Sequence, residues 1–164
     1  MVLLGFLIVS AYVAYIGTSL GLYAMFERYV LLVLAVAAGI GFGGPLRSAI
    51  PAESPYLYGL CLLTIAVAGF LLLRSFARFC FGDPEINYPV FVDRAGGALL
   101  GFAIGYTALS YLALVVMSLH LALPGQDWSR QLTAAAKWAV ITANAVGHLA
   151  GTGSPITLDA VLPV

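Results

Sequence analysis

The feature that most constrains this chain is a long run without charged side chains, from Ala95 to Gln126. Glycines recur inside it at four-residue spacing, at Gly97, Gly101 and Gly105, so all three fall on one face of a helix. In water such a helix is weak, because each interior glycine costs about 1 kcal/mol relative to alanine. In lipid the same spacing lets two helix backbones approach closely, which favours association of membrane helices. The run therefore predicts a membrane helix that packs through its glycines.

The composition also indicates a protein embedded in a lipid bilayer. Of the 164 residues, 62% are hydrophobic and 9% are charged, whereas soluble domains have about 45–50% apolar and about 25% charged residues. Seven basic and seven acidic residues give a net charge of zero. The chain therefore lacks the basic surface that nucleic-acid binding requires.

Four uncharged or nearly uncharged segments are long enough to cross a bilayer, which takes about 20 helical residues. They cover residues 1–26, 29–46, 54–73 and 93–123. The predicted fold is an all-α integral membrane protein with four transmembrane helices, which form a domain over residues 1–126.

Local signals predict where these helices begin and end. Glu27-Arg28 is interpreted as the turn between the first two helices, and the glycines and proline of residues 39–45 as the end of the second. Asp93 is predicted to cap the fourth helix with its side chain. Residues 39–44 also satisfy G-x-G-x-x-G. Because this motif closes an apolar helix rather than following a strand, it does not indicate a nucleotide site, and no cofactor is expected.

The tail, residues 127–164, is predicted to lie outside the membrane core. Its first part has apolar residues at helical spacing on a weak apolar face, and Lys137 and Asn144 interrupt it. An amphipathic helix in the membrane interface fits this pattern better than a fifth span. The residues that define the face are Leu132, Ala136, Ala139 and Ala143.

The chain resembles the colicin V production protein (CvpA) family of bacterial inner-membrane proteins. Asp93-Arg94 followed by the glycine stripe is similar to that family's opening of its last helix. The segment 126–132, with Trp128, is similar to the acidic–Trp–Ser segment that follows it. Gly17 and Gly21 ahead of Glu27-Arg28 are similar to its first connection, although Thr18, Ser19 and Leu20 stand where the family usually has arginines.

The resemblance implies four membrane helices, a tail outside the cytoplasm and a part in envelope upkeep or peptide-toxin secretion, without enzymatic activity. The positive-inside rule favours the same orientation, with both termini outside the cytoplasm. One predicted side carries Arg28, Arg74, Arg78 and Arg94, and the other carries Arg47, Arg130 and Lys137.

The charged pairs Glu27-Arg28 and Asp93-Arg94 are interpreted as caps or ion pairs at the membrane surface. Neither histidine has a partner at metal-ligand spacing, and no catalytic set is recognisable. The favoured hypothesis is a non-enzymatic accessory membrane protein that contacts a protein partner or further copies of itself. The alternative is a small oligomeric channel or transporter component, in which Thr64, Thr107 and Ser110 would face a pore.

Overall fold

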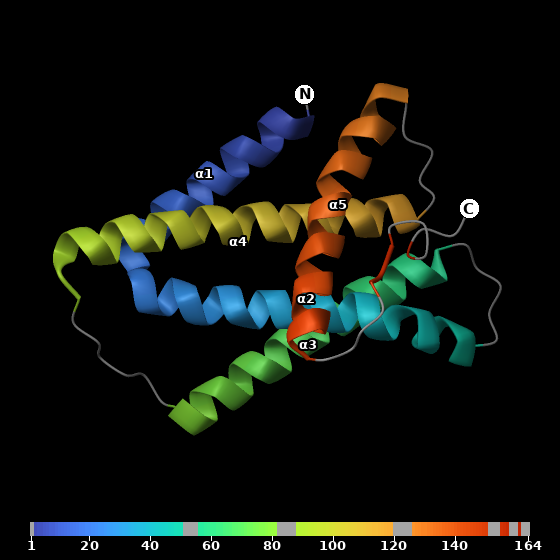
Figure 1. Cartoon of the computed structure of the whole chain (residues 1–164), viewed down its shortest axis with the longest axis horizontal. Helices are drawn as coiled ribbons and strands as arrows, with labels where there is room; N and C mark the ends of the chain where they lie inside the picture. Colours follow the sequence, from blue (N-terminus) through green and yellow to red (C-terminus); the bar gives the residue numbers. More distant parts are fainter. Residues whose placement is uncertain are drawn as a thin grey trace.

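The computed structural model describes residues 2–50, 56–81, 88–119, 126–150, 155–157 and Val161. Helices α1 and α4 lie side by side, α2 and α3 pack next to them, and α5 crosses α4 and α2 steeply (Figure 1). The bounds are α1 Val2–Leu20, α2 Leu22–Ala49, α3 Leu57–Phe81, α4 Val90–Ser118 and α5 Gln126–Leu149.

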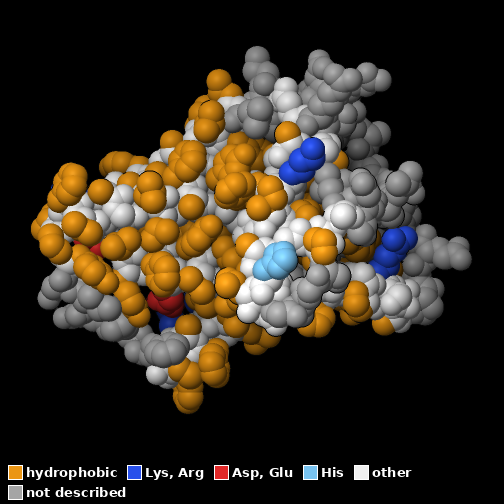
Figure 2. All heavy atoms as spheres, in the orientation of Figure 1, with side chains coloured by type: hydrophobic (Ala, Val, Ile, Leu, Met, Phe, Trp, Pro, Cys, Tyr) orange, Lys and Arg blue, Asp and Glu red, His pale blue; other side chains and the backbone are white. Residues whose placement is uncertain are grey.

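Three of these helices are long and apolar enough to cross a membrane, namely α2, α4 and residues Leu57–Cys80 of α3. Helix α1 is apolar but shorter. Large hydrophobic side chains point outward from them, such as Phe79, which is 89% exposed, and Phe91, which is 83% exposed. Hydrophobic side chains likewise cover much of the described surface seen in Figure 2. This is the arrangement of a multi-pass membrane protein whose outer surface contacts lipid.

The turn between α1 and α2 lies at Gly21, so the prediction that Glu27-Arg28 forms it is wrong. Gly21 has φ 85° and ψ 166°, a region of backbone conformation that is essentially restricted to glycine. Glu27 and Arg28 lie inside α2, where both are partly buried. The charged pair misled the prediction because the actual turn is a single glycine within uncharged sequence.

The glycines and the proline of residues 39–45 do not end α2, contrary to the prediction. The helix continues through Pro45 to Ala49. Membrane helices tolerate glycine and proline, because neighbouring helices and serine or threonine side chains satisfy the freed backbone groups. Near the end of the helix the Ser48 hydroxyl donates to the Pro45 carbonyl oxygen at 2.8 Å.

Two of these glycines instead admit side chains from neighbouring helices into the core. A Cβ on Gly43 would lie 2.7 Å from a methyl group of Leu62, and one on Gly39 would overlap the hydroxyl of Tyr111. That hydroxyl donates to the Leu62 carbonyl oxygen at 2.7 Å. By contrast, a Cβ on Gly41 would meet nothing within 4 Å. Gly39 and Gly43 thus serve the packing of α2 against α3 and α4, whereas Gly41 and Gly44, the other two glycines of the motif, meet no neighbouring atoms.

This packing makes Gly39→Ala and Tyr111→Phe energetically coupled. We expect Gly39→Ala to cost about 1–3 kcal/mol through overpacking and Tyr111→Phe about 0.5–1.5 kcal/mol through the lost hydrogen bond. The double variant should cost less than the sum, because without the hydroxyl the new Cβ meets the Tyr111 Cζ at 3.1 Å. Melting temperatures of the wild type, the two single variants and the double variant in mild detergent give the double-mutant cycle. Effects that add within about 0.5 kcal/mol would contradict the coupling.

Helix α4 begins at Val90, and its N-cap is Pro89, without a side-chain cap hydrogen bond. The prediction that Asp93 caps this helix is therefore wrong, because Asp93 already lies in the first turn. The structure ends α4 at Ser118, whereas the predicted segment extends to residue 123.

The tail helix α5 is confirmed as a helix, and its four predicted face residues, Leu132, Ala136, Ala139 and Ala143, are all buried. Ala136, Ala139 and Ala143 share one core cluster with residues of α2, α3 and α4. Asn144 does not disturb this helix. Its amide donates to the carbonyl oxygen of Ile156 and accepts from the Ile156 N–H, both at 2.8 Å. Asn144 thereby fastens the segment 155–157 to α5.

We expect Asn144→Ala to release that segment. Loss of both hydrogen bonds, at about 1 kcal/mol each, should raise the rate of proteolysis after residue 150 by about 5–30-fold. Asn144→Asp retains an acceptor for the Ile156 N–H and should give an intermediate rate. Equal cleavage of all three proteins, read by mass spectrometry of the fragments, would show that Asn144 does not hold the segment.

Candidate functional site

The predicted glycine stripe brings the backbones of α1 and α4 close together. Gly97 and Gly17 face one another, and a Cβ on either would overlap the carbonyl oxygen of the other. A Cβ on Gly101 would lie 2.6 Å from the Val13 carbonyl oxygen, and one on Gly105 would lie 2.8 Å from the Ser10 Cα. The neighbours are backbone atoms, so α1 and α4 are in direct backbone contact along this stripe.

Asp93 links the end of this interface to α2. Its carboxylate accepts a hydrogen bond from the Leu22 N–H at 2.7 Å, so it caps α2 rather than its own helix. A Cβ on Gly21 would lie 2.7 Å from one carboxylate oxygen of Asp93 and 2.8 Å from the other. Glycine at position 21 therefore permits both the turn and the approach of the carboxylate, and Asp93 joins α1, α2 and α4 at one point.

The other predicted surface residues take different positions. Arg94 is exposed and lines a shallow cleft with Tyr15, Thr18 and Phe91 at the same end of the bundle. Glu27 and Arg28 lie in α2, within two turns of its start. The side chain of Trp128 lies outside the described part of the chain.

An aromatic cluster that the sequence analysis missed fastens α5 to α4 and α1. The ring of Tyr106 makes edge-to-face contacts with Trp138, at 5.7 Å between centroids, and with Phe6, at 6.4 Å. Trp138 Nε1–H also donates to the Thr107 hydroxyl at 3.4 Å. Each edge-to-face aromatic pair contributes about 0.5–1.5 kcal/mol beyond burial. Aromatic spacing along α4 alone gives no signal for this cluster, because its members come from three helices.

The polar residues assigned to a hypothetical pore lie in different environments. Thr107 and Ser110 are fully buried, and the Ser110 hydroxyl donates to the Tyr106 carbonyl oxygen at 2.7 Å. Thr64 is exposed on α3. Their placement indicates helix packing for the first two and contact with lipid for the third.

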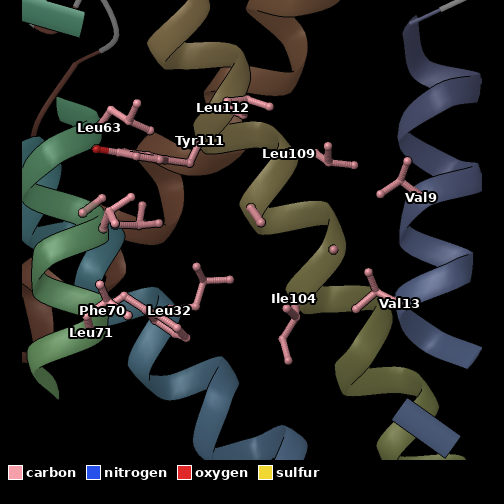
Figure 3. A pocket seen from close by; sticks show the side chains of 15 residues that line it. Val9, Val13, Leu32, Leu63, Phe70, Leu71, Ile104, Leu109, Tyr111 and Leu112 are labelled. Atoms are coloured by element: carbon pink, nitrogen blue, oxygen red, sulfur yellow. The ribbon is translucent and has the colours of Figure 1, made fainter. Parts of the chain in front are cut away.

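A cleft of about 430 Å³ opens among α1, α2, α3 and α4 near the middle of their lengths (Figure 3). Val9 and Val13 of α1 lie on one side of α4 and Leu63 and Phe70 of α3 on the other. The walls are almost entirely apolar. The cleft therefore offers no group for acid–base or nucleophilic chemistry.

Groups of three or more histidine, cysteine, aspartate or glutamate side chains that would suit a metal ion are absent from the described residues. Comparison with models of protein families, with curated proteins and with solved structures finds no match for this chain. The arrangement of α1, α2 and α4 around Gly17, Gly97 and Asp93 is accordingly the best-defined candidate site.

Proposed function

We propose that this chain is a non-enzymatic integral membrane protein of the CvpA-like type that acts as a structural or accessory subunit. Its proposed location is a bacterial inner membrane, in envelope upkeep or toxin secretion. The main support is the contrast between its two kinds of surface. Glycine-mediated backbone contact joins α1 to α4, while large apolar side chains on α1, α3 and α4 remain exposed. Such a molecule presents surfaces for lipid and for other membrane helices.

Four spans are supported by the pairing of α1 with α4. The 19 residues of α1 extend about 28 Å at 1.5 Å per residue, close to the hydrocarbon thickness of about 30 Å. The glycines of α4 contact α1 in antiparallel order, with Gly97 opposite Gly17 and Gly105 opposite Ser10. If α4 crosses the membrane, α1 is long enough to cross beside it.

The same geometry supports an interfacial position for α5. Phe6, near the start of α1, shares a buried cluster with Ala113 of α4 and with Leu132 and Ala135 of α5. Helix α5 thus lies at the level where α1 begins, as Figure 1 also shows. We propose that a helix at this level lies in the membrane interface, with the Trp138 side of α5 reaching inward to Tyr106 and Thr107 of α4.

Orientation is proposed from the distribution of arginines. The Asp93–Leu22 hydrogen bond places the starts of α2 and α4 at one end of the bundle, which brings Arg28 and Arg94 to that end. Under the positive-inside rule this end faces the cytoplasm, and both chain termini lie on the opposite side.

Reporter fusions test the topology. Fusions after residues 22 and 86 should report the cytoplasm, and fusions after residues 50 and 150 the opposite side. Identical reports from positions 22 and 50 would contradict a span by α2, and an odd number of crossings would contradict the four-span arrangement.

Purification in mild detergent tests the accessory role. After chemical cross-linking in the membrane, we expect a partner protein or a second copy in fixed stoichiometry. A chain that stays monomeric and uncross-linked contradicts the proposal. Ion flux through the purified protein in liposomes would favour the channel alternative.

A further inference from the structure

The apolar cleft at the middle of the bundle is a feature that helix packing alone does not use. Its walls come from four helices, with Leu32 of α2 at its base between α1 and α3 (Figure 3). Helix α4 contributes Ile104, Ala108 and Leu112. All of these residues lie well inside their helices, so in the proposed topology the cleft lies at the depth of the lipid hydrocarbon.

The polar side chain among the residues that line the cleft is already satisfied. Tyr111 forms part of the wall, but its hydroxyl is directed to the Leu62 carbonyl oxygen at 2.7 Å. An occupant therefore meets hydrocarbon on every side and gains nothing from polar groups of its own. We infer that the cleft holds one acyl chain of a membrane phospholipid, between α1 and α3.

The size of the cleft distinguishes an acyl chain from a transmembrane helix. A helix about 10 Å wide with a pitch of 5.4 Å fills on the order of 420 Å³ per turn, so 430 Å³ admits about one turn. A spanning helix has about 20 residues, more than five turns. An extended hydrocarbon is narrow enough to enter. If a methylene takes about as much space as a water molecule, at about 30 Å³, the cleft admits on the order of 14 methylenes.

Packing explains why the acyl chain would stay in the cleft. An acyl chain that moves from the bilayer into the cleft exchanges one hydrocarbon environment for another and gains nothing from the hydrophobic effect. It is therefore held by dispersion contacts with the walls of the cleft. Its residence therefore depends on the shape of the cleft and is sensitive to side chains that fill it.

The test uses phenylalanine to fill the cleft. Ala108 is exposed and lines it, so Ala108→Phe adds a ring there. Ala68→Phe is the matched control, because Ala68 is also exposed but lies outside the lining of the cleft. Native mass spectrometry of protein purified from membranes counts the bound phospholipids. We expect the wild type and Ala68→Phe to retain one lipid, and Ala108→Phe to lose about ten-fold in occupancy.

Val67→Phe fills the cleft from the α3 wall and replaces Ala108→Phe if that variant does not fold. In vesicles, a phosphatidylcholine with a mid-chain diazirine should cross-link to Val9, Val13 or Leu112, and less so in the filled variants. Equal lipid retention in all proteins would overturn the inference. A wild-type dimer that the Ala108→Phe substitution dissociates would overturn it as well, because the occupant of the cleft would then be a second copy of the protein. The inference rests on the proposed membrane topology, which the reporter fusions test separately from lipid retention.

Discussion

Replacing Gly97 with alanine is expected to lower the melting temperature in mild detergent by about 6–12 °C. The new Cβ would overlap the Gly17 carbonyl oxygen, and backbone atoms of α1 cannot turn away as a side chain would. The overpacking cost lies near the upper end of about 1–3 kcal/mol, and each kcal/mol shifts the melting temperature by about 2–4 °C for a chain of this size. Fluorescence-monitored unfolding of the purified protein measures the shift.

Gly69→Ala provides the matched control, because a Cβ at Gly69 of α3 meets nothing within 4 Å. Alanine is favoured over glycine in helices by about 1 kcal/mol, so this variant should be as stable as the wild type or more so. The same chemical change thus has opposite effects on two helices. Equal melting temperatures for Gly97→Ala and Gly69→Ala would show that α1 and α4 are not held in backbone contact.

Loss of the Asp93 carboxylate is expected to have the second largest effect. Asp93→Ala removes the acceptor for the Leu22 N–H, and a hydrogen bond to a charged group contributes about 1.5–3 kcal/mol. Gly21→Ala disturbs the same contact and should have a comparable effect, because its backbone conformation costs other residues about 1–3 kcal/mol and the Cβ would press on the carboxylate. Amide hydrogen exchange at the start of α2 should increase in both variants.

Asp93→Asn and Arg94→Ala separate the cap from general effects of charge. Asparagine keeps an acceptor oxygen and should retain part of the stability. Arg94 is an exposed neighbour, so its removal should change stability by no more than about 0.5 kcal/mol. If Arg94→Ala destabilises as much as Asp93→Ala, the contribution comes from charge at this end of the bundle and not from the cap.

The existence of the helices follows from the distribution of charge, while their ends do not. Long uncharged runs predict membrane helices directly, and the periodic apolar residues of the tail predict the buried face of α5. The α1–α2 boundary escaped prediction because Gly21 carries no polar signal, whereas Glu27-Arg28 carries a strong one. Similarly, residues 39–45 have the composition of a turn, yet they are helical and pack against α3 and α4 through Gly39 and Gly43.

The interactions that join helices were beyond sequence analysis for a different reason. Asp93 follows the local preference for a cap residue, but its partner lies on another helix, 71 residues away. The aromatic cluster of Tyr106, Trp138 and Phe6 is likewise assembled from three helices. Single-sequence patterns report which face of a helix is apolar, and they contain no information on which distant residue meets it.

The separation between Leu22 and Asp93 also has a consequence for biogenesis. During synthesis at about 5–20 residues per second, the separation of 71 positions between Leu22 and Asp93 corresponds to roughly 4–14 s. Throughout that interval the first amide of α2 lacks its carboxylate and the glycine face of α1 lacks α4. Helices α1 and α2 therefore persist as an incomplete intermediate until α4 has been made. Quality-control proteases and insertion factors have that time in which to bind it.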